Sequence, residues 1–126
     1  MTTRRTFIAA AMLMLSSLAL AAQAPNITGT WTAKFDTQVG EQEYTYEFVV
    51  KGTTLTGTAT GNLLGKSEIA DGKIEGGMIT FIENGNYMGM PLRIEYSGTV
   101  VSNGEIKFAR KIGDFGAEEF VAKRSK

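Results

Sequence analysis

The sequence contains no cysteine and no histidine. Without these residues the chain cannot build a Ser-His-Asp or Cys-His nucleophile, and it cannot hold zinc through imidazole or thiolate ligands. Disulfides and a lipid anchor on cysteine are excluded for the same reason. Any acid–base chemistry must therefore use carboxylates, lysine or tyrosine, and the folded state must be stabilised by packing.

Helical periodicity and an excess of positive charge are also missing. After the N-terminal segment, no window with helix caps shows apolar residues at helical spacing, and no glycine-rich phosphate loop opens a helix. The chain has 13 Lys and Arg against 13 Asp and Glu, whereas nucleic-acid binding requires a basic stripe. We therefore predict no nucleic-acid partner, no cofactor and no metal.

Residues 1–21 have the pattern of an export signal. Arg4 and Arg5 precede an alanine- and leucine-rich run that is too short and too poorly flanked for a membrane anchor. The two arginines and their neighbours resemble a twin-arginine signal, and Sec export is the alternative. Small residues fit cleavage after Ala21. We expect residues 22–126 to form one domain that is periplasmic or secreted and not embedded in the membrane.

The segment from Ile27 to Phe35 begins a strict alternation around the only tryptophan, Trp31. Small or apolar residues occupy one face of this segment: Gly29, Trp31, Ala33 and Phe35. This is the period of a strand with one buried side and one solvated side. Trp31 is therefore predicted to lie in the core.

Further strand-like segments follow along the chain. They cover residues 43–51, 54–62, 66–75, 78–82, 91–101, 105–112 and 118–124. The third of these is interrupted at Asp71-Gly72, as either a bulge or an extra hairpin. We predict an all-β fold with no substantial helix after the signal peptide. It is a single antiparallel up-and-down barrel of about eight strands, or a closely related sandwich.

The connections between these segments differ in length. Tight turn signals stand at Gly52, Gly76-Gly77 and Asn103-Gly104. Longer connections are predicted at residues 37–42, 62–65, 83–90 and 113–117. Because alternate connections of a meander emerge at the same end, the sequence predicts a barrel with one closed end and one open mouth with binding loops.

Two of the longer connections supply the candidate ligand-binding residues. They offer amides, carboxylate, aromatic rings and adaptable methionine side chains. The candidates are Asn84, Asn86, Tyr87, Met88, Asp114 and Phe115. The alternative is that these are ordinary glycine-rich loops whose aromatic rings fold back over the end of the core.

No catalytic residue is predicted. A glycoside hydrolase requires two carboxylates across the scissile bond, and Glu47 and Glu95 are mid-strand carboxylates. Both alternate with the apolar set and so should face outward. We expect solvated charges at these positions.

The motif Gly29-x-Trp31 resembles the first-strand motif of the calycins, which include lipocalins and avidins. In those folds a late arginine packs over the indole, so the resemblance implies this role for Arg124 or Arg110. The run from Leu55 to Thr58 also looks avidin-like. The further tryptophans that line biotin pockets are missing, and biotin binding is not implied.

Residues 35–40 and 113–124 are similar to a small exported bacterial β-domain found beside carbohydrate esterases and proteins labelled xylanases. This resemblance implies that the protein occurs among proteins of glycan degradation, but it implies no role for the domain itself. The leading hypothesis is an exported, non-catalytic binding or accessory domain that holds a carbohydrate or another small ligand through loops at the mouth. The alternatives are a glycan-degrading hydrolase of the xylanase or esterase-associated kind, and a structural or inhibitor-like envelope protein.

Overall fold

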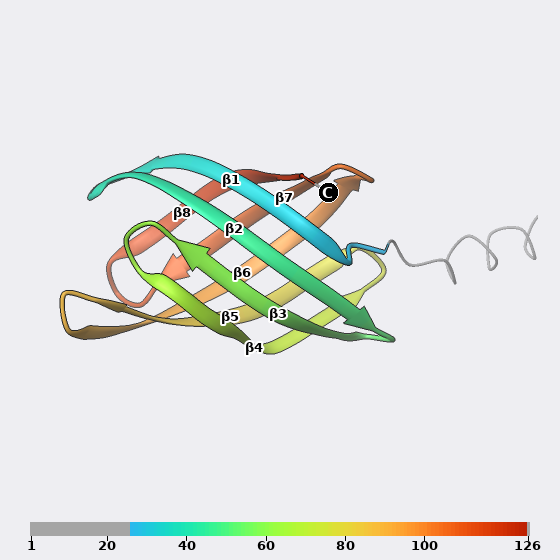
Figure 1. The fold of residues 1–126 in the computed structure, drawn as a ribbon, viewed down its shortest axis with the longest axis horizontal. Coiled ribbons are helices and arrows are strands. Elements are labelled where there is room, and N and C mark those ends of the chain that lie inside the picture. The colour runs from blue at the N-terminus through green and yellow to red at the C-terminus, as the bar shows by residue number, and fades with distance from the viewer. Residues whose placement is uncertain (1–25, 126) are drawn as a thin grey trace, which may run out of the picture.

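The structure, a computed structural model, describes residues 26–125. Eight strands form a closed antiparallel barrel in which each strand pairs with the next and the last pairs with the first (Figure 1). In chain order they are β1 (Gly29–Thr37), β2 (Gly40–Lys51), β3 (Thr54–Gly61), β4 (Gly65–Glu75), β5 (Met78–Tyr87), β6 (Met90–Ser102), β7 (Glu105–Ile112) and β8 (Gly116–Arg124). The predicted all-β up-and-down barrel is confirmed, and the fold closes as a barrel rather than a sandwich.

The signal peptide predicted over residues 1–21 lies outside the described residues, as does the start of the predicted domain. Within residues 26–125, no helix is long and apolar enough to cross a membrane. The first and last described segments meet, because Arg124 donates a hydrogen bond to the carbonyl of Asn26. They meet at the end of the barrel that carries the β2–β3, β4–β5 and β6–β7 turns, which we call the closed end (Figure 1).

Alternation decides which side chains enter the barrel. In β2 every second residue from Gln42 to Phe48 is buried and those between are exposed. Successive side chains of a strand point to opposite faces, so this period separates an inner from an outer set. The centre of the barrel is aromatic, with ring centroids 4.3 to 6.5 Å apart. Its members are Tyr46, Phe81, Tyr96, Phe108 and Phe120.

The strands are longer than predicted at the other end, which carries the β1–β2, β3–β4, β5–β6 and β7–β8 turns and which we call the open end. The long loops predicted there are wrong: these turns contain only two or three residues. The segment Asn84–Tyr87 belongs to β5, and its register with β6 pairs Gly85 with Leu92 and Tyr87 with Met90. Cross-strand pairing thus overrides the weak strand propensity of asparagine and glycine.

The two ends differ in composition rather than in turn length. Each turn of the open end carries an exposed apolar side chain: Val39, Leu63, Met88 and Phe115. Met88 is 87% exposed and Phe115 is 64% exposed. The closed-end turns consist of Gly52-Thr53, Gly76-Gly77 and Asn103-Gly104. Among the described turns, exposed large apolar side chains therefore occur in those of the open end, and we call these four residues the apolar rim.

The interruption in β4 is a bulge and not an extra hairpin. Asp71 adopts a left-handed backbone with φ of 52°, and the pairing of β4 shifts register on both sides at this point. A Cβ on Gly72 would lie 2.1 Å from the carbonyl oxygen of Leu55. Glycine at this position lets β3 and β4 approach across the bulge.

β1 and β8 close the barrel through a short pairing. Only Trp31↔Arg124 and Thr32↔Lys123 are in register between the two strands. Farther toward the open end, Phe35 stacks on Phe120 with centroids 4.2 Å apart and ring planes 9° apart. Side-chain packing thus completes the wall where the backbone ladder stops.

Candidate functional site

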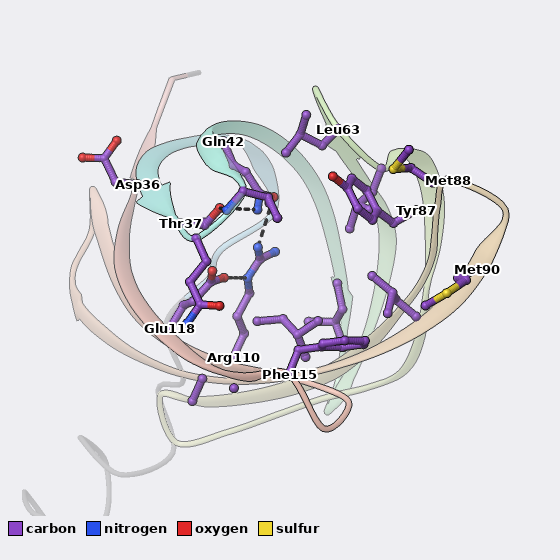
Figure 2. A pocket seen from close by; sticks show the side chains of 18 of the residues that line it. Asp36, Thr37, Gln42, Leu63, Tyr87, Met88, Met90, Arg110, Phe115 and Glu118 are labelled. Atoms are coloured by element: carbon purple, nitrogen blue, oxygen red, sulfur yellow. Dashed lines mark hydrogen bonds and ion pairs between the residues drawn. The ribbon is translucent and has the colours of Figure 1, made fainter.

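A cavity of about 800 Å³ lies in the open end of the barrel (Figure 2). Residues from all four open-end turns and from the adjoining strand ends line it. Most of the lining is an apolar wall: Val39, Leu63, Leu64, Tyr87, Met88, Met90, Leu92, Ile94, Ile112 and Phe115. Four polar side chains form a polar floor: Thr37, Gln42, Arg110 and Glu118. The exposed residues Asp36, Gln38 and Glu119 also border the cavity.

Arg110 is the centre of the polar floor, and its side chain is only 1% exposed. Its Nε donates to Glu118 Oε1 at 2.7 Å, and its Nη2 donates to Gln42 Oε1 at 3.1 Å. Gln42 in turn donates through Nε2 to Thr37 Oγ1 at 3.1 Å. The guanidinium carbon also lies 4.8 Å from the ring centroid of Phe35. These contacts from β1, β2 and β8 fix the guanidinium at the base of the cavity.

A second polar group, which we call the tyrosine layer, lies beneath the floor and consists of Glu83, Tyr44, Tyr46 and Tyr96. The Glu83 carboxylate is fully buried and accepts from Tyr96 Oη at 2.7 Å and from Tyr44 Oη at 2.9 Å. Arg110 Nη1 donates to Tyr96 Oη at 3.0 Å and lies 3.9 Å from Glu83 Oε1. Tyr96 therefore joins the layer to the floor.

Hydroxyl protons can be assigned throughout the tyrosine layer. Tyr96 has one proton, which it donates to Glu83, so Tyr46 must be the donor in its 3.0 Å contact with Tyr96. Tyr44 donates its proton to the other Glu83 oxygen. When Glu83 is ionised, every hydroxyl proton of the layer thus has one acceptor.

Burial shifts the pKa values of this group. It raises the pKa of Glu83, although hydrogen bonds from Tyr96 and Tyr44 and the charge of Arg110 oppose the shift. It also raises the pKa of Tyr44, Tyr46 and Tyr96. Burial acts to lower the pKa of Arg110, but its tyrosine and Glu118 contacts outweigh burial and leave it raised.

The partners Glu83 and Arg110 therefore respond differently to burial. Arg110 bonds directly to Glu118 and Tyr96, and it stays cationic. Glu83 lies 3.9 Å from Arg110, beyond hydrogen-bond distance, so burial dominates its pKa. The stable cation at the floor is Arg110.

Carboxylates are poorly placed for hydrolysis. Glu83 is covered by two tyrosines and is not part of the cavity lining, whereas Glu118 borders the cavity directly. Glu47 and Glu95 are exposed, as predicted, on the outer faces of β2 and β6. Asp36 and Glu119 also border the cavity, and both are exposed. The arrangement can bind and orient polar groups.

The predicted ligand-binding residues are divided between the cavity and the surface. Those that line the cavity are Tyr87, Met88 and Phe115. Asn84 is exposed on β5, and Asp114 is exposed in the β7–β8 turn. Asn86 accepts a hydrogen bond from the Gly89 N–H at 3.0 Å and so supports the β5–β6 turn. Ligand contact by any of the six stays a prediction.

Sequence reasoning missed the polar residues inside the barrel. Glu83 was predicted in a loop, and Arg110 was considered only as a cover for Trp31. Alternation contained the signal, because Glu83 follows the inward Phe81 at strand spacing and Arg110 follows Phe108 in the same way. Three inward tyrosine hydroxyls also required buried hydrogen-bond partners.

No protein-family model matches the chain, and neither the curated proteins nor the solved structures give a match. The interpretation of the site therefore depends on the chain's own residues.

Proposed function

We propose that this protein is an exported, non-catalytic binding protein that holds a small amphipathic molecule in the open-end cavity. The observation that carries the proposal is a cavity of about 800 Å³ with an apolar wall and a polar floor. Ligand sites commonly enclose ~300–1,000 Å³ and combine apolar lining with a few fixed polar groups. An amphipathic ligand would place its apolar body against the wall and its polar head at the floor.

The exposed turn residues support this proposal. Val39, Leu63, Met88 and Phe115 belong both to the cavity lining and to the exposed apolar rim. Apolar surface of this kind often marks a binding site. Methionine adapts its shape to different partners, which suits Met88 to a cavity mouth.

A carbohydrate ligand agrees less well with the lining. Tyr87 and Phe115 could stack on a sugar ring. However, the amides of Asn84 and Asn86, which would hydrogen-bond a sugar, do not line the cavity. Carbohydrates therefore enter the binding screen as the second ligand class.

The other hypotheses receive less support from the geometry. Hydrolysis of a glycan would need two carboxylates set across one bond; of the three that border the cavity, Glu118 is bonded to Arg110, and Asp36 and Glu119 are exposed. Binding a partner through a strand edge would need an open, flat edge, and the described strands close into a barrel. A relationship to the calycins stays a proposal. It is supported by the eight-stranded barrel and by the packing of a late arginine over Trp31, which is Arg124 and not Arg110.

Ligand binding can be tested with Nile red, an uncharged dye that fluoresces in apolar sites. The purified protein should bind the dye saturably, and medium-chain alcohols should displace it. Leu92→Trp should block binding, because residue 92 lines the cavity and a larger ring at this position would occupy part of it. Calorimetry with soluble oligosaccharides would run in parallel.

Val101→Trp is the matched control, because Val101 is 56% exposed near the closed end of β6. It should bind the dye as the wild type does. Equal binding by Leu92→Trp and wild type would place the site outside this cavity. Absence of dye and alcohol binding in the folded wild type would refute the proposed function.

A further inference from the structure

The charge of Arg110 is compensated before any ligand arrives. Its Nε–Glu118 contact of 2.7 Å is a charge-assisted hydrogen bond, and Glu83 lies 3.9 Å away on its other side. Among the described residues that line the cavity, Arg110 is the only cation. A buried guanidinium with two carboxylate neighbours offers no uncompensated positive charge to an anionic ligand.

The polar floor nevertheless keeps hydrogen-bonding capacity. Arg110 uses three N–H groups in bonds to Glu118, Gln42 and Tyr96, and a guanidinium carries more donors than these. Within residues 26–125, Glu118 accepts through Oε1 alone, so its second oxygen can accept from a ligand. The Gln42 amide also has a second N–H beyond the one bonded to Thr37.

We infer that the cavity selects an amphipathic ligand whose head group is uncharged and both donates and accepts hydrogen bonds, such as a hydroxyl or a primary amide. This inference rests on the proposed function and specifies its ligand. The head accepts from Arg110 or Gln42 and donates to the free oxygen of Glu118. Such a head group satisfies the unused hydrogen-bond donors and acceptors of the polar floor and adds no charge there.

Charged heads meet an opposing group in the same place. A ligand carboxylate that approaches Arg110 competes with Glu118, whose side chain is 20% exposed and already bonded at 2.7 Å. An ammonium group that approaches Glu118 lies next to the guanidinium. Because Glu118 and Arg110 are bonded at 2.7 Å, either ligand charge would lie beside a like charge, and burying it there is costly. An uncharged head avoids both costs.

A matched series of decanol, decylamine and decanoate tests the inference by displacement of Nile red. At pH 7.5 the amine is cationic and the carboxylate is anionic, and all three are used below their micelle concentrations. Decanol should bind at least about tenfold more tightly than either charged ligand, which corresponds to ~1.4 kcal/mol. Decanoate or decylamine binding as tightly as decanol would overturn the inference while leaving the proposed function intact.

Glu118→Gln supplies the second measurement. The substitution removes the carboxylate that competes for Arg110, so decanoate should gain at least about tenfold in affinity relative to decanol. Glu47→Gln is the control, because Glu47 is exposed on the outer face of β2, does not line the cavity, and should leave the relative affinities of the three ligands unchanged. An unchanged decanoate affinity in folded Glu118→Gln would also overturn the inference. If none of the three ligands binds, both the proposed function and the inference fail.

Discussion

The guanidinium of Arg124 lies 4.5 Å from the centroid of the Trp31 ring, and the two residues are partners in the β1–β8 pairing that closes the barrel. The same guanidinium donates to the carbonyls of Asn103 at 2.9 Å, Thr28 at 3.0 Å and Asn26 at 3.0 Å. It thus joins the last strand to the β6–β7 turn and to the segment before β1. Trp31 is fully buried under this contact.

Arg124→Ala should lower the free energy of unfolding by about 2–4 kcal/mol, because it removes a cation–π contact and charge-assisted hydrogen bonds to three carbonyls. Arg124→Lys should cost less, since it keeps the charge but loses the planar fork of donors. Urea unfolding followed by Trp31 fluorescence measures both variants. A loss below ~0.5 kcal/mol for Arg124→Ala would mean that the short pairing and Trp31 packing close the barrel alone.

Gly98 of β6 faces the interior of the barrel, where a Cβ would lie 2.6 Å from two carbons of the Phe108 ring. Gly98→Ala should therefore overpack the core and destabilise the protein by about 1–3 kcal/mol. Gly104→Ala is the control, since a Cβ at that position has no atom within 4 Å, and it should change stability by less than ~0.5 kcal/mol. Thermal and urea unfolding measure the difference.

A double variant checks the cause of this effect. Gly98→Ala combined with Phe108→Leu should lose less stability than the sum of the two single variants, because the smaller side chain makes room for the methyl group. Additive losses would show that the ring of Phe108 is not what excludes a side chain at position 98.

Glu83 should make stability fall as pH rises above 4.5. Its ordinary pKa is 4.5, and burial raises the pKa in the folded state. In the window between these two values the folded protein retains a proton that the unfolded chain has released, so the free energy of unfolding decreases with increasing pH. The contribution is fully present below pH 4.5 and is lost as pH rises through the raised folded pKa.

Glu83→Gln cannot release a proton, so its stability relative to wild type should increase across this pH window. Any cost of the amide within the tyrosine layer is independent of pH and shifts the whole curve. Urea unfolding at a series of pH values measures the difference, and Glu95→Gln on the outer wall should follow the wild-type curve. Parallel curves for Glu83→Gln and wild type would show that Glu83 has the same pKa folded and unfolded.

Much of the fold was predictable because local patterns decide it. The alternation around Trp31 predicted that its ring lies in the core, and Asn103-Gly104 predicted a tight turn. Residues 71–72 were predicted to form a bulge or a hairpin. The pairing of β4 with β3 and with β5 shows that they form a bulge. The extension of β5 through Asn84–Tyr87 was missed, because a strand with weak propensity forms where a neighbouring strand pairs with it.

The candidate site was predictable in location but only partly in composition. Tyr87, Met88 and Phe115 line the cavity at the predicted end. Arg110 and Glu83 at its base were not recognised as partners. Each lies at an inward position by simple alternation, but their meeting depends on the pairing of β5, β6 and β7.

The sequence by itself determined an all-β chain, the inner and outer faces of its strands, and a Trp31 core without disulfides. These follow from side-chain period, turn residues and the lack of cysteine, which all act locally. Only the tertiary structure decided that Arg110 meets Glu118, Gln42 and the tyrosine layer beneath one cavity. Alternation fixes the face of a strand, whereas strand register and the stagger of a closed barrel fix the height at which side chains from different strands meet.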